Sequence, residues 1–578
     1  MTETSLTTMQ QETWKEVTRA LDRHVHGQIG QAVNGISPIQ ASLVYLDWLA
    51  HFCASPGKQL EVVKETADDV KDAATRLLKP GGCDDHCHDD RRFAAPAWRQ
   101  WPFNVYAQAF QLTERAWERA THEVPGLNKR HSDVASFAAR QWLDVMAPSN
   151  LPFTNPEVIQ ATLQEGGMNL VRGWMNWLDD MQRETRGVPP AGVEAFKVGE
   201  TVAITPGKVV FQNDLIELIQ YTPTTEKVHA EPVLFVPAWI MKYYILDLSP
   251  NNSMVKYLVD RGHTVFMISW KNPSEADRDK SMETYRQDGV MAALDVVRRI
   301  VPKHKVHAVG YCLGGTLLQI AAATMGRDGD DRLASMSLFA AQGDFTEAGE
   351  LLLFINEAEI NLLEAMMAEQ GYLKGSQMAG AFQLLHSNDL IWSRALKYYM
   401  LGERDLPNDL MAWNADTTRM PYRMHSEYLH KLFLRNDLAG GRYEVDGQPI
   451  WFTDIQVPCF AVGTSSDHVA PWKSVYKLHL LPLDLTFVLT SGGHNAGILS
   501  EPGHPKRHFQ LQHRAAGERY MSPEAWTAKV PHQEGSWWPA WENWLAQQSS
   551  GLMAPPRMGL PGKKVALPDA PGEYVRIP

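Results

Sequence analysis

Apolar positions in the first third of the chain follow the helical period. In "QLEVVKETADDVKDAATRLLKP" the residues Val62, Val63, Ala67, Val70 and Ala74 recur at spacings of three and four, which is typical of one face of an amphipathic helix. Similar patterns fill residues 1 to about 80 and 94–190. They are interrupted by a predicted loop at "PGGCDDHCHDDRRF" (80–93) and by the connection "APSNLPFTNPE" (147–157), which contains three prolines. We therefore expect a mainly helical N-terminal domain over residues 1–195.

The pattern changes near residue 200, where short apolar or alternating runs predict strands. These runs are "TVAIT" (201–205), "KVVFQNDLIELIQYTP" (208–223), "PVLFVPAWI" (232–240), "HTVFMISW" (263–270), "VHAVGYC" (306–312), "LASMSLFAA" (333–341), "VPCFAVGT" (457–464) and "LTFVLTSGGH" (485–494). Helix-like segments lie between most of them. This alternation predicts an α/β domain over residues 196–578, with a mostly parallel sheet and helices on both faces.

Two segments of this second domain break the alternation. Residues 342–445 contain the helix-like stretches "GELLLFINEAEINLLEAMMAEQGYL" and "NDLIWSRALKYYMLGE". An insertion at this point would lie over the carboxyl ends of the strands, where such sheets place their sites, so we expect a helical cap. The tail 551–578 is rich in proline and glycine and is expected to run extended along the surface.

One strand–helix junction carries a candidate nucleophile. Residues 310–314 read Gly310-Tyr311-Cys312-Leu313-Gly314, which is the G-x-S-x-G elbow of α/β-hydrolases with cysteine in place of serine. Gly310 and Gly314 would allow the strand and the helix to approach closely. The backbone N–H of Leu313 would serve as one oxyanion donor. A second donor is expected from the loop after the strand at 232–240, at Trp239 or Ile240.

A nucleophile of this kind needs an acid and a base that follow it in the chain, in the order nucleophile, acid, histidine. Asp467 in "GTSSDHVAPW" and His494 in "TSGGHNAGI" follow two predicted strands in that order. We therefore expect Cys312, Asp467 and His494 to form a catalytic triad. Asp247 and His468 are alternatives for the acid and the base. The competing interpretation is that Cys312 is a buried structural thiol and His494 a turn residue.

Composition limits the classes of function. The net charge of −12 argues against nucleic acid as a partner. Five cysteines in 578 residues do not make a disulfide framework and are typical of a reducing compartment. The N-terminus "MTETSLTTMQQETWKE" has no signal-peptide pattern, and no apolar run reaches the roughly 18 residues of a membrane span. We expect a cytoplasmic protein.

Other reactive or aromatic residues allow two interpretations each. "CDDHCHDD" brings together Cys83, His86, Cys87 and His88, either as a solvated loop, which we favour, or as an adventitious metal site. Cys53 and Cys459 are expected to be buried structural thiols. The four tryptophans of "GSWWPAWENWL" are expected to pack on the sheet, and the alternative is a polymer-facing surface; they are Trp537, Trp538, Trp541 and Trp544.

A cysteine nucleophile suits the synthesis of esters from acyl thioesters. Exchange of one thioester for another is nearly balanced in free energy, so the acyl group stays activated on the enzyme. Transfer to a hydroxyl then makes an oxygen ester and is downhill. A serine nucleophile would lose that activation in the first step.

Several long motifs together resemble the bacterial polyhydroxyalkanoate synthases. They are "GYCLGG", "VPAWIMKYYILDLSPNNSMVKYLVDRGHTVFMISWKNP", "SSDHVAPW", "SGGHNAGI" and "GSWWPAWENWL", with "APSNLPFTNPE", "GGMNLVRG" and "ELIQYTPTTE" in agreement. The resemblance runs from about residue 90 to the C-terminus. A single chain of this length is similar to classes I and II, and the Tyr311 and Leu313 that flank Cys312 look more like class I, which favours short hydroxyacyl units.

The resemblance implies an α/β-hydrolase fold and a polymerase of (R)-3-hydroxyacyl-CoA thioesters. In that family the cysteine, here Cys312, carries the growing chain as a thioester. His494 would deprotonate the thiol and also the 3-hydroxyl of the incoming substrate. Asp467 would orient His494 or act at that hydroxyl. The chemistry requires no metal and no organic cofactor, because CoA is only the leaving group of the substrate.

The resemblance also implies partners and a location. It implies a homodimer at the surface of cytoplasmic polyester granules, with phasins as further partners and a cap that takes part in dimerisation. Residues of the cap that match the family are assigned to packing or dimer contacts before catalysis; they are Trp392, Trp413, Asn414 and Asp416. The helices before residue 90 are either plain core or a granule-binding or phasin-binding element. The rival functions are an intracellular depolymerase or thioesterase and a non-catalytic granule-binding protein.

Overall fold

The computed structural model of the 578-residue chain describes residues 3–33, 35–77, 90–378, 380, 387–562 and 568–578. The chain forms two compact units, each treated by itself below. The sheet unit comprises Met1–Gly35, Val193–Met378 and Asn408–Pro578, and the helical unit comprises Ile36–Gly192 and Ala379–Pro407. This division differs from the domain boundaries expected from the sequence in two segments, 1–35 and 379–407.

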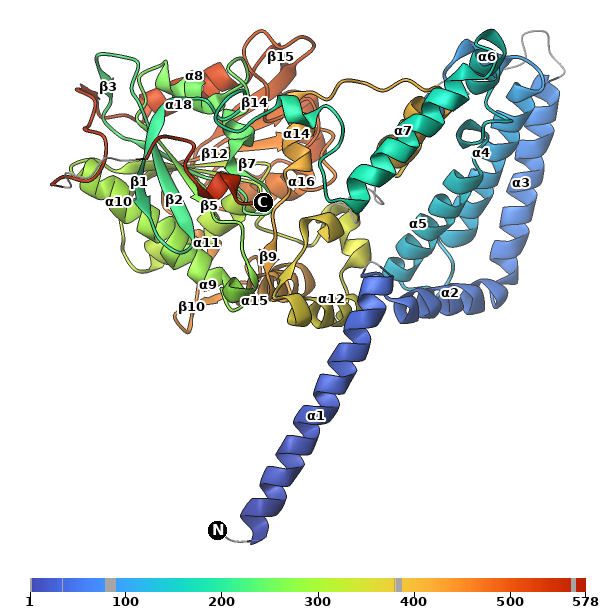
Figure 1. The fold of residues 1–578 in the computed structure, drawn as a ribbon, viewed down its shortest axis with the longest axis horizontal. Coiled ribbons are helices and arrows are strands. Elements are labelled where there is room, and N and C mark those ends of the chain that lie inside the picture. The colour runs from blue at the N-terminus through green and yellow to red at the C-terminus, as the bar shows by residue number, and fades with distance from the viewer. Residues whose placement is uncertain (1–2, 34, 78–89, 379, 381–386, 563–567) are drawn as a thin grey trace. The chain divides into compact units, whose positions relative to one another are not determined.

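A ten-stranded sheet forms the core of the sheet unit (Figure 1). Its strand order is β1-β2-β5-β4-β6-β7-β12-β13-β14-β15. The five strand pairs from β5 to β13 are parallel, and the outer pairs are antiparallel. The bounds are β1 Gly207–Gln212, β2 Ile216–Tyr221, β4 Val233–Val236, β5 Val265–Trp270, β6 Val306–Tyr311, β7 Leu333–Phe339, β12 Cys459–Thr464, β13 Leu485–Thr490, β14 His508–Arg514 and β15 His532–Glu534.

The parallel strands are buried on both faces, as their near-continuous apolar runs predict. Every residue of β4, β5, β6, β12 and β13 is buried. The accompanying helices are α8 Met254–Val259, α9 Met282–Thr284, α10 Ala292–Ile300, α11 Leu313–Arg327, α16 Trp472–Tyr476, α17 Pro523–Lys529 and α18 Trp538–Gln547. The prediction of an α/β fold with a mostly parallel sheet is confirmed.

The tryptophans at the start and along α18 pack on the sheet, as expected. The Trp541 ring lies 4.9 Å from Phe339 and 6.3 Å from Phe235 between centroids. Its Nε1–H donates to Ser337 Oγ at 2.9 Å. Trp537 and Trp538 are buried as well. The interpretation of these side chains as structural packing is confirmed.

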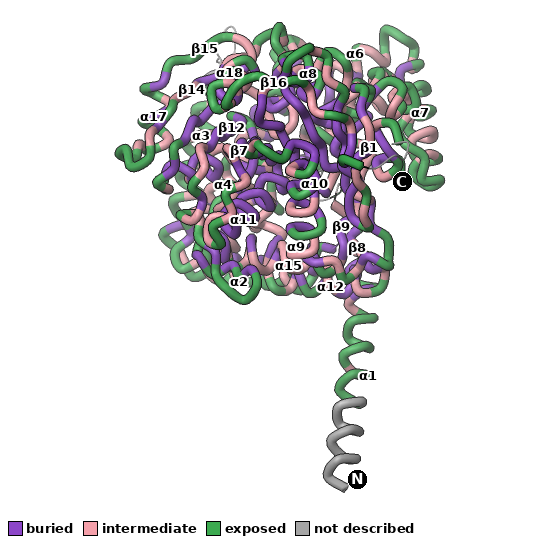
Figure 2. Tube along the Cα trace, turned by 90° about the vertical axis from the view of Figure 1, so that its left-hand side faces the viewer, coloured by how far each residue is buried: buried purple, intermediate pink, exposed green. Residues whose placement is uncertain are grey.

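Most of the expected cap belongs to the sheet unit. Its elements there are α12 Glu357–Gln370, β8 Tyr372–Leu373, α14 Asp409–Ala415, β9 Met420–Pro421, α15 Tyr422–Glu427 and the π-helix η12 Tyr428–Leu434. The long helix α1, Glu3–Ala32, packs on α12 through its C-terminal part, where a Cβ at Gly30 would lie 2.5 Å from the Met366 side chain. Residues 14–25 of α1, all but one of them exposed, extend from this contact towards the N-terminus (Figure 2).

Among its described residues, the helical unit contains six α-helices and one part of the expected cap. The helices are α2 Pro38–Cys53, α3 Pro56–Leu77, α4 Phe103–Thr121, α5 Lys129–Met146, α6 Pro156–Gln164 and α7 Met168–Thr185. The π-helices η10 Asn388–Trp392 and η11 Ala395–Met400 join them. Contact between α7 and η11 is close: a Cβ at Gly173 would lie 1.9 Å from the Tyr399 carbonyl oxygen, and Asn169 Nδ2 donates to the Met400 carbonyl at 2.9 Å.

Two expectations from the sequence are wrong. "TVAIT" (201–205) is not a strand, because Ala203 has a φ of +53° and its N–H donates to the Asp247 carbonyl, which turns the chain away from a sheet. Cys53 is exposed, because it ends α2 on a face that the neighbouring helices leave open. Cys459, by contrast, is buried in β12 as expected.

The C-terminal tail follows the edge of the sheet. Val209 N–H donates to the Pro568 carbonyl, and Glu217 accepts the N–H groups of Glu573 and Tyr574. In the described part of the chain, no helix is long and apolar enough to span a bilayer.

Candidate active site

Cys312 stands at the strained junction between β6 and α11. Its φ of +52° is unusual for a residue with a side chain, and its N–H donates to the Phe339 carbonyl at 2.9 Å. The residue is buried, and α11 begins directly after it at Leu313. A sharp strand-to-helix turn with a reactive side chain at its apex is the geometry of the nucleophile elbow.

The two glycines of the motif are sterically required. A Cβ at Gly310 would lie 2.3 Å from Gly315 Cα, and a Cβ at Gly314 would lie 2.1 Å from the Val236 carbonyl oxygen. Any side chain at either position would force the strand and the helix apart. The elbow therefore depends on glycine on both sides of Cys312.

Asp467 and His494 meet at the same end of the sheet. Asp467 follows β12 and His494 follows β13, which lie parallel. His494 Nδ1 lies 2.8 Å from Asp467 Oδ2, so the two side chains form a hydrogen bond. The hydrogen bond fixes the orientation of the imidazole.

Asp467 is held by three further donors. Thr464 Oγ1 donates to Oδ2 at 2.8 Å, and the N–H groups of Val469 and Ala470 donate to Oδ1 at 2.9 and 2.8 Å. Burial acts to raise the pKa of Asp467, but the charge of His494 and these hydrogen bonds outweigh burial and lower it. The carboxylate is therefore ionised and both of its oxygens are occupied.

His494 interacts with Asp467 on one side and with Cys312 on the other. Burial acts to lower the pKa of His494. The negative charges of Asp467 and of the Cys312 thiolate, each with a hydrogen bond to the ring, outweigh burial and raise this pKa well above its usual value. The site thus favours the protonated form of His494.

The structure thus brings together Cys312, His494 and Asp467. The two alternatives for the acid and the base, Asp247 and His468, do not take these positions. Asp247 is buried elsewhere and accepts hydrogen bonds from Ser253 Oγ at 2.7 Å and from Thr205 Oγ1. Burial raises the pKa of Asp247 to about 6. The imidazole that bonds Asp467 belongs to His494 and not to the neighbouring His468.

The expected oxyanion donors lie close to the elbow in the topology. Leu313 is the first residue of α11. Trp239 and Ile240 follow β4, whose last residue Val236 pairs with Gly310 of β6. The Trp239 side chain is buried against Tyr285, 5.2 Å between ring centroids, and its carbonyl accepts from Thr418 Oγ1 at 2.8 Å. The role of these backbone N–H groups as oxyanion donors stays a prediction.

An aromatic cluster in the cap segment was not identified from the sequence. The rings of Tyr428, Phe433 and Phe345 lie 4.8 to 6.2 Å from one another. Burial raises the pKa of Tyr428 well above its usual value, and the negative charge of Cys312 raises it further. The helical pattern of this segment predicted a cap but could not show which of its aromatic residues would pack together.

The remaining predicted residues have structural positions. Trp413 is buried, and its Nε1–H donates to the Lys242 carbonyl at 2.7 Å; Asp416 accepts from Tyr244 Oη at 2.9 Å. Asn414 is exposed and Trp392 is half-buried in η10. The expected loop with Cys83, His86, Cys87 and His88 lies outside the described residues.

Comparison with known proteins agrees with this geometry. Residues 89–258 match the family model of the poly-beta-hydroxybutyrate polymerase (PhaC) N-terminus, residues 16–58 match a second N-terminal model of that polymerase, and residues 231–501 match the alpha/beta hydrolase fold. The match at 16–58 lies in the first 80 residues, which resemble the family only in general character.

Full-length relatives are similar over most of the chain. The poly(3-hydroxyalkanoate) polymerase of Methylorubrum extorquens is 41% identical over 493 residues, which cover 84% of this chain and 81% of the relative. The polymerase subunit PhaC of Cupriavidus necator is 37% identical over 496 residues, covering 84% and 83%. Poly(3-hydroxyalkanoate) polymerase 2 of Ectopseudomonas oleovorans is 35% identical over 492 residues, covering 84% and 86%.

Proposed function

From the finding that the chain belongs to the poly(3-hydroxyalkanoate) polymerases, acyltransferase-type synthases with an α/β-hydrolase fold, we propose how it makes polyester. Cys312 takes the acyl group from an (R)-3-hydroxyacyl-CoA thioester and releases CoA. The observation that carries the proposal is the arrangement at the elbow. Cys312 sits at a positive φ, its side chain interacts with His494, and His494 is bonded to Asp467.

The first step loads the enzyme. His494 accepts the proton of the Cys312 thiol, and the thiolate attacks the carbonyl carbon of the acyl-CoA. The bond from this carbon to Cys312 Sγ forms as the bond to the CoA sulfur breaks, and the CoA sulfur takes the proton back from His494. The N–H of Leu313, with that of Trp239 or Ile240, would stabilise the oxyanion between these events.

The second step forms the ester. The 3-hydroxyl of an incoming substrate gives its proton to His494, and its oxygen attacks the carbonyl of the Cys312 thioester. The new C–O bond replaces the bond to Sγ, and the thiolate recovers a proton from His494. The lengthened chain is then a CoA thioester, which loads Cys312 again and releases CoA.

Asp467 orients His494 in this scheme. Its Oδ2 accepts from His494 and Thr464, and its Oδ1 accepts two backbone N–H groups. A carboxylate engaged at both oxygens is a poor base for a substrate hydroxyl. We therefore favour the orienting role over direct action at the 3-hydroxyl.

The surroundings of the thiol favour transfer over hydrolysis. Cys312 is buried, with 8% of its surface exposed. Free water therefore has poor access to a thioester at Cys312, whereas the substrate brings its own hydroxyl to the site. This supports a synthase over the rival thioesterase or depolymerase.

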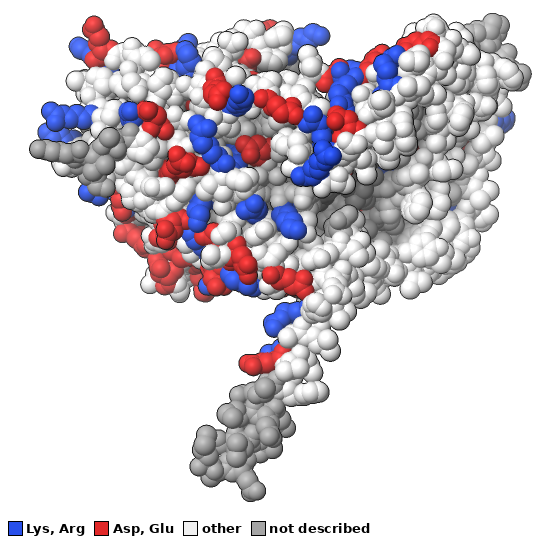
Figure 3. Space-filling view, viewed as in Figure 1, with Lys and Arg blue, Asp and Glu red and all other residues white. Residues whose placement is uncertain are grey.

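The proposed location is the surface of a cytoplasmic polyester granule, with phasins and a second copy of the chain as partners. Exposed apolar residues support it in both units: Trp14, Val17 and Leu21 on α1 of the sheet unit, and Trp142, Phe153 and Trp174 in the helical unit. The visible surface over α3–α5 carries few charged side chains (Figure 3). Such surface is typical of a protein that binds an apolar material.

The deciding experiment measures CoA release from (R)-3-hydroxybutyryl-CoA and sizes the acyl product. We would compare wild type, Cys312→Ala and the matched control Cys459→Ala, which removes a buried thiol from the start of β12. We expect thiol release with high-mass polyester in wild type and control, and neither in Cys312→Ala. Release with only free hydroxy acid would show a thioesterase. No release from wild type would overturn the proposed substrate.

A further inference from the structure

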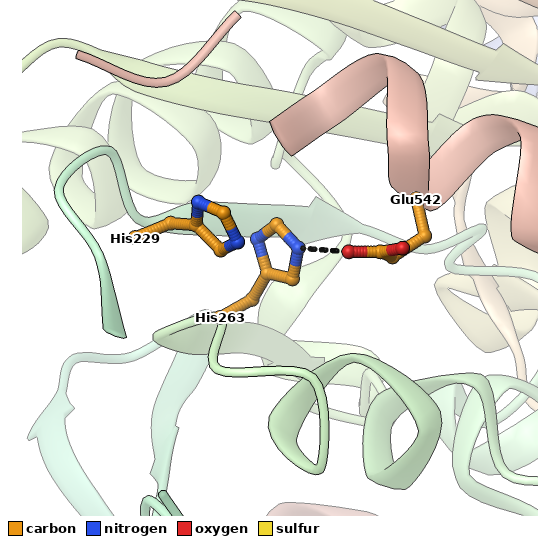
Figure 4. Close-up of side chains that lie close together, drawn as sticks. All are labelled: His229, His263 and Glu542. Atoms are coloured by element: carbon orange, nitrogen blue, oxygen red, sulfur yellow. Dashed lines mark hydrogen bonds and ion pairs between the residues drawn. The ribbon is translucent and has the colours of Figure 1, made fainter. Parts of the chain in front are cut away.

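Two histidines and a glutamate meet at the end of the sheet opposite to Cys312. His229 ends the short strand β3, Val228–His229, just before β4, and His263 lies just before β5. Glu542 reaches them from α18 (Figure 4). Cys312 follows the carboxyl end of β6, which runs parallel to β4, whereas this cluster lies at the amino ends of the parallel strands. It is therefore separate from the proposed active site.

The three side chains are close enough to share one ion. Each offers one ligand atom, and these atoms lie within 4.8 Å of one another. His263 Nε2 is 3.3 Å from Glu542 Oε1, and the two imidazole rings are 4.4 Å apart between centroids, with 20° between their planes. A half-buried His229 can rotate about its broad terminal torsion, and such a rotation would turn a ring nitrogen towards an ion beside His263.

His263 has one nitrogen that lacks a partner. The residue is 1% exposed, and its Nδ1 is buried without a hydrogen bond in the described part of the chain. Figure 4 shows this nitrogen on the side of His229, with Glu542 at the opposite edge of the ring. The Glu542 carboxylate accepts a hydrogen bond from Nε2 of His263. This favours the His263 tautomer with its proton on Nε2, so that Nδ1 keeps a lone pair directed towards His229.

The donor set suits a transition-metal cation. The two imidazole rings stack next to each other, and the Glu542 carboxylate lies 3.3 Å from one of them. The Arg261 guanidinium stacks over Tyr257, 3.7 Å from the ring centroid. Two imidazoles beside one carboxylate favour ions such as Zn²⁺, Ni²⁺ or Cu²⁺ over hard oxygen-seeking cations.

We propose that His229 and His263 bind a first-row divalent cation such as Zn²⁺, and that Glu542 holds the His263 imidazole through Nε2 and balances the charge. Carboxylate, imidazole and metal in line is a common arrangement in proteins. The ion would join β3 and the start of β5 to α18, whose tryptophans pack on the sheet. Its role is to stabilise the sheet unit, and it takes no part in acyl transfer.

The test uses the full chain without a histidine tag, after treatment with a chelator. Cys83→Ser, His86→Gln, Cys87→Ser and His88→Gln are first introduced together to remove the other cluster of donor residues. Zn²⁺ binding is then measured by isothermal titration calorimetry, and the melting temperature is measured with and without Zn²⁺. The test variants are His229→Gln and Glu542→Gln. The matched control is His513→Gln, which removes an exposed histidine 2.8 Å from Asp484.

We expect one Zn²⁺ per chain and a higher melting temperature with Zn²⁺ in the background protein and in His513→Gln. His229→Gln and Glu542→Gln, checked for folding by circular dichroism, should each weaken binding at least about tenfold. Absence of stoichiometric binding would overturn the proposal, and so would equal affinity in His229→Gln and the background protein. Neither result would affect the proposed polymerase, which is tested at Cys312.

Discussion

Tryptophans on helices of the two units differ in exposure. Around α18 of the sheet unit Trp537, Trp538 and Trp541 are at most 1% exposed, whereas Trp142 on α5 and Trp174 on α7 of the helical unit are 75% and 58% exposed. A parallel sheet must have both faces covered, so the aromatic side chains of its helices are buried in one core. The amphipathic helices α5 and α7 keep large apolar side chains on the surface. The comparison shows that α18 completes a core, whereas α5 and α7 leave apolar side chains exposed.

Buried ion pairs also differ between the units. In the sheet unit Asp467 orients one imidazole beside a thiol. In the helical unit the Arg92 guanidinium binds three carboxylates, those of Asp90, Glu114 and Asp144. The first pair positions a proton acceptor next to a nucleophile. The second ties the segment before α4 to α4 and α5.

The largest expected effect is the loss of activity when Asp467 is substituted, and it tests the functional difference between these two networks. Asp467→Asn should lower kcat by about 10⁴-fold with little change in stability, because an amide favours the wrong tautomer of His494 and no longer stabilises its imidazolium. Without the Asp467 charge the pKa of His494 should also fall, which NMR titration of the ring can follow. Polymer formation from (R)-3-hydroxybutyryl-CoA gives kcat.

The control for this prediction is Asp144→Asn in the helical unit. It removes one of the three carboxylates around Arg92, and it should leave kcat within about twofold, because this network contains no nucleophile and no proton acceptor for one. A large loss of kcat in Asp144→Asn, or nearly full activity in Asp467→Asn, would contradict the functional difference between the networks.

The second prediction concerns buried and exposed tryptophan. Trp541→Ala should lower the free energy of unfolding by about 3–5 kcal/mol, because it leaves a cavity against Phe235 and Phe339. Trp142→Ala should change it by less than about 0.5 kcal/mol. Denaturant unfolding followed by circular dichroism measures both. Similar losses in the two variants would show that the helical unit buries Trp142 in solution.

The third prediction is acid sensitivity of the sheet unit. Burial is the main cause that lowers the pKa of His307, His425 and His479 to about 4 each. The unfolded chain takes up these protons near pH 6.5 and the folded chain does not, so stability should fall as the pH falls from 6.5 to 4, by about 3 kcal/mol per histidine. Hydrogen exchange of the backbone amides, corrected for its intrinsic pH dependence, measures the stability of each unit separately.

The helical unit should respond differently to acid. Burial raises the pKa of Glu114 and Asp144, and a raised carboxyl pKa favours the folded state as the pH falls. Protection should therefore be lost first in the strands of the sheet unit. Earlier loss in α4 and α5 would refute this order.

The smallest expected effect on stability comes from substituting exposed apolar residues of the helical unit. The double variant Phe153→Ser and Trp174→Ser should unfold within about 0.5 kcal/mol of wild type. Its affinity for particles of amorphous polyhydroxybutyrate should fall at least about tenfold, because each side chain contributes about 1.5–3 kcal/mol when it is buried. A sedimentation assay measures the bound fraction. The control Trp451→Ser removes an exposed tryptophan of the sheet unit, and an equal loss in both proteins would show that this surface has no special role.

Much of the sheet unit could be predicted because its strands and its elbow show as patterns among residues that are close in the sequence. A buried strand shows as an apolar run, and an elbow shows as a reactive residue between two glycines, so β4, β5, β6, β7, β12 and β13 and the position of Cys312 were all expected. The strands β14 and β15 at one end of the sheet were missed, since "HFQLQHR" and "HQE" are polar and depend on pairing with β13 and with each other. "TVAIT" failed for the converse reason: its pattern is that of a strand, but Ala203 adopts a positive φ.

The sequence by itself determined the fold class, the elbow and the chain order of nucleophile, acid and histidine, because periodicity, turn chemistry and the order of residues are properties of neighbours along the chain. Three features could be seen only in the folded chain: Asp467 bonds His494, Cys53 is exposed, and residues 379–407 join the helical unit. The cluster of His229, His263 and Glu542 also belongs here, since α18 returns to the sheet some 280 residues after His263. Contacts between distant segments depend on which faces are buried together, and this is settled by the free energy of packing the whole chain.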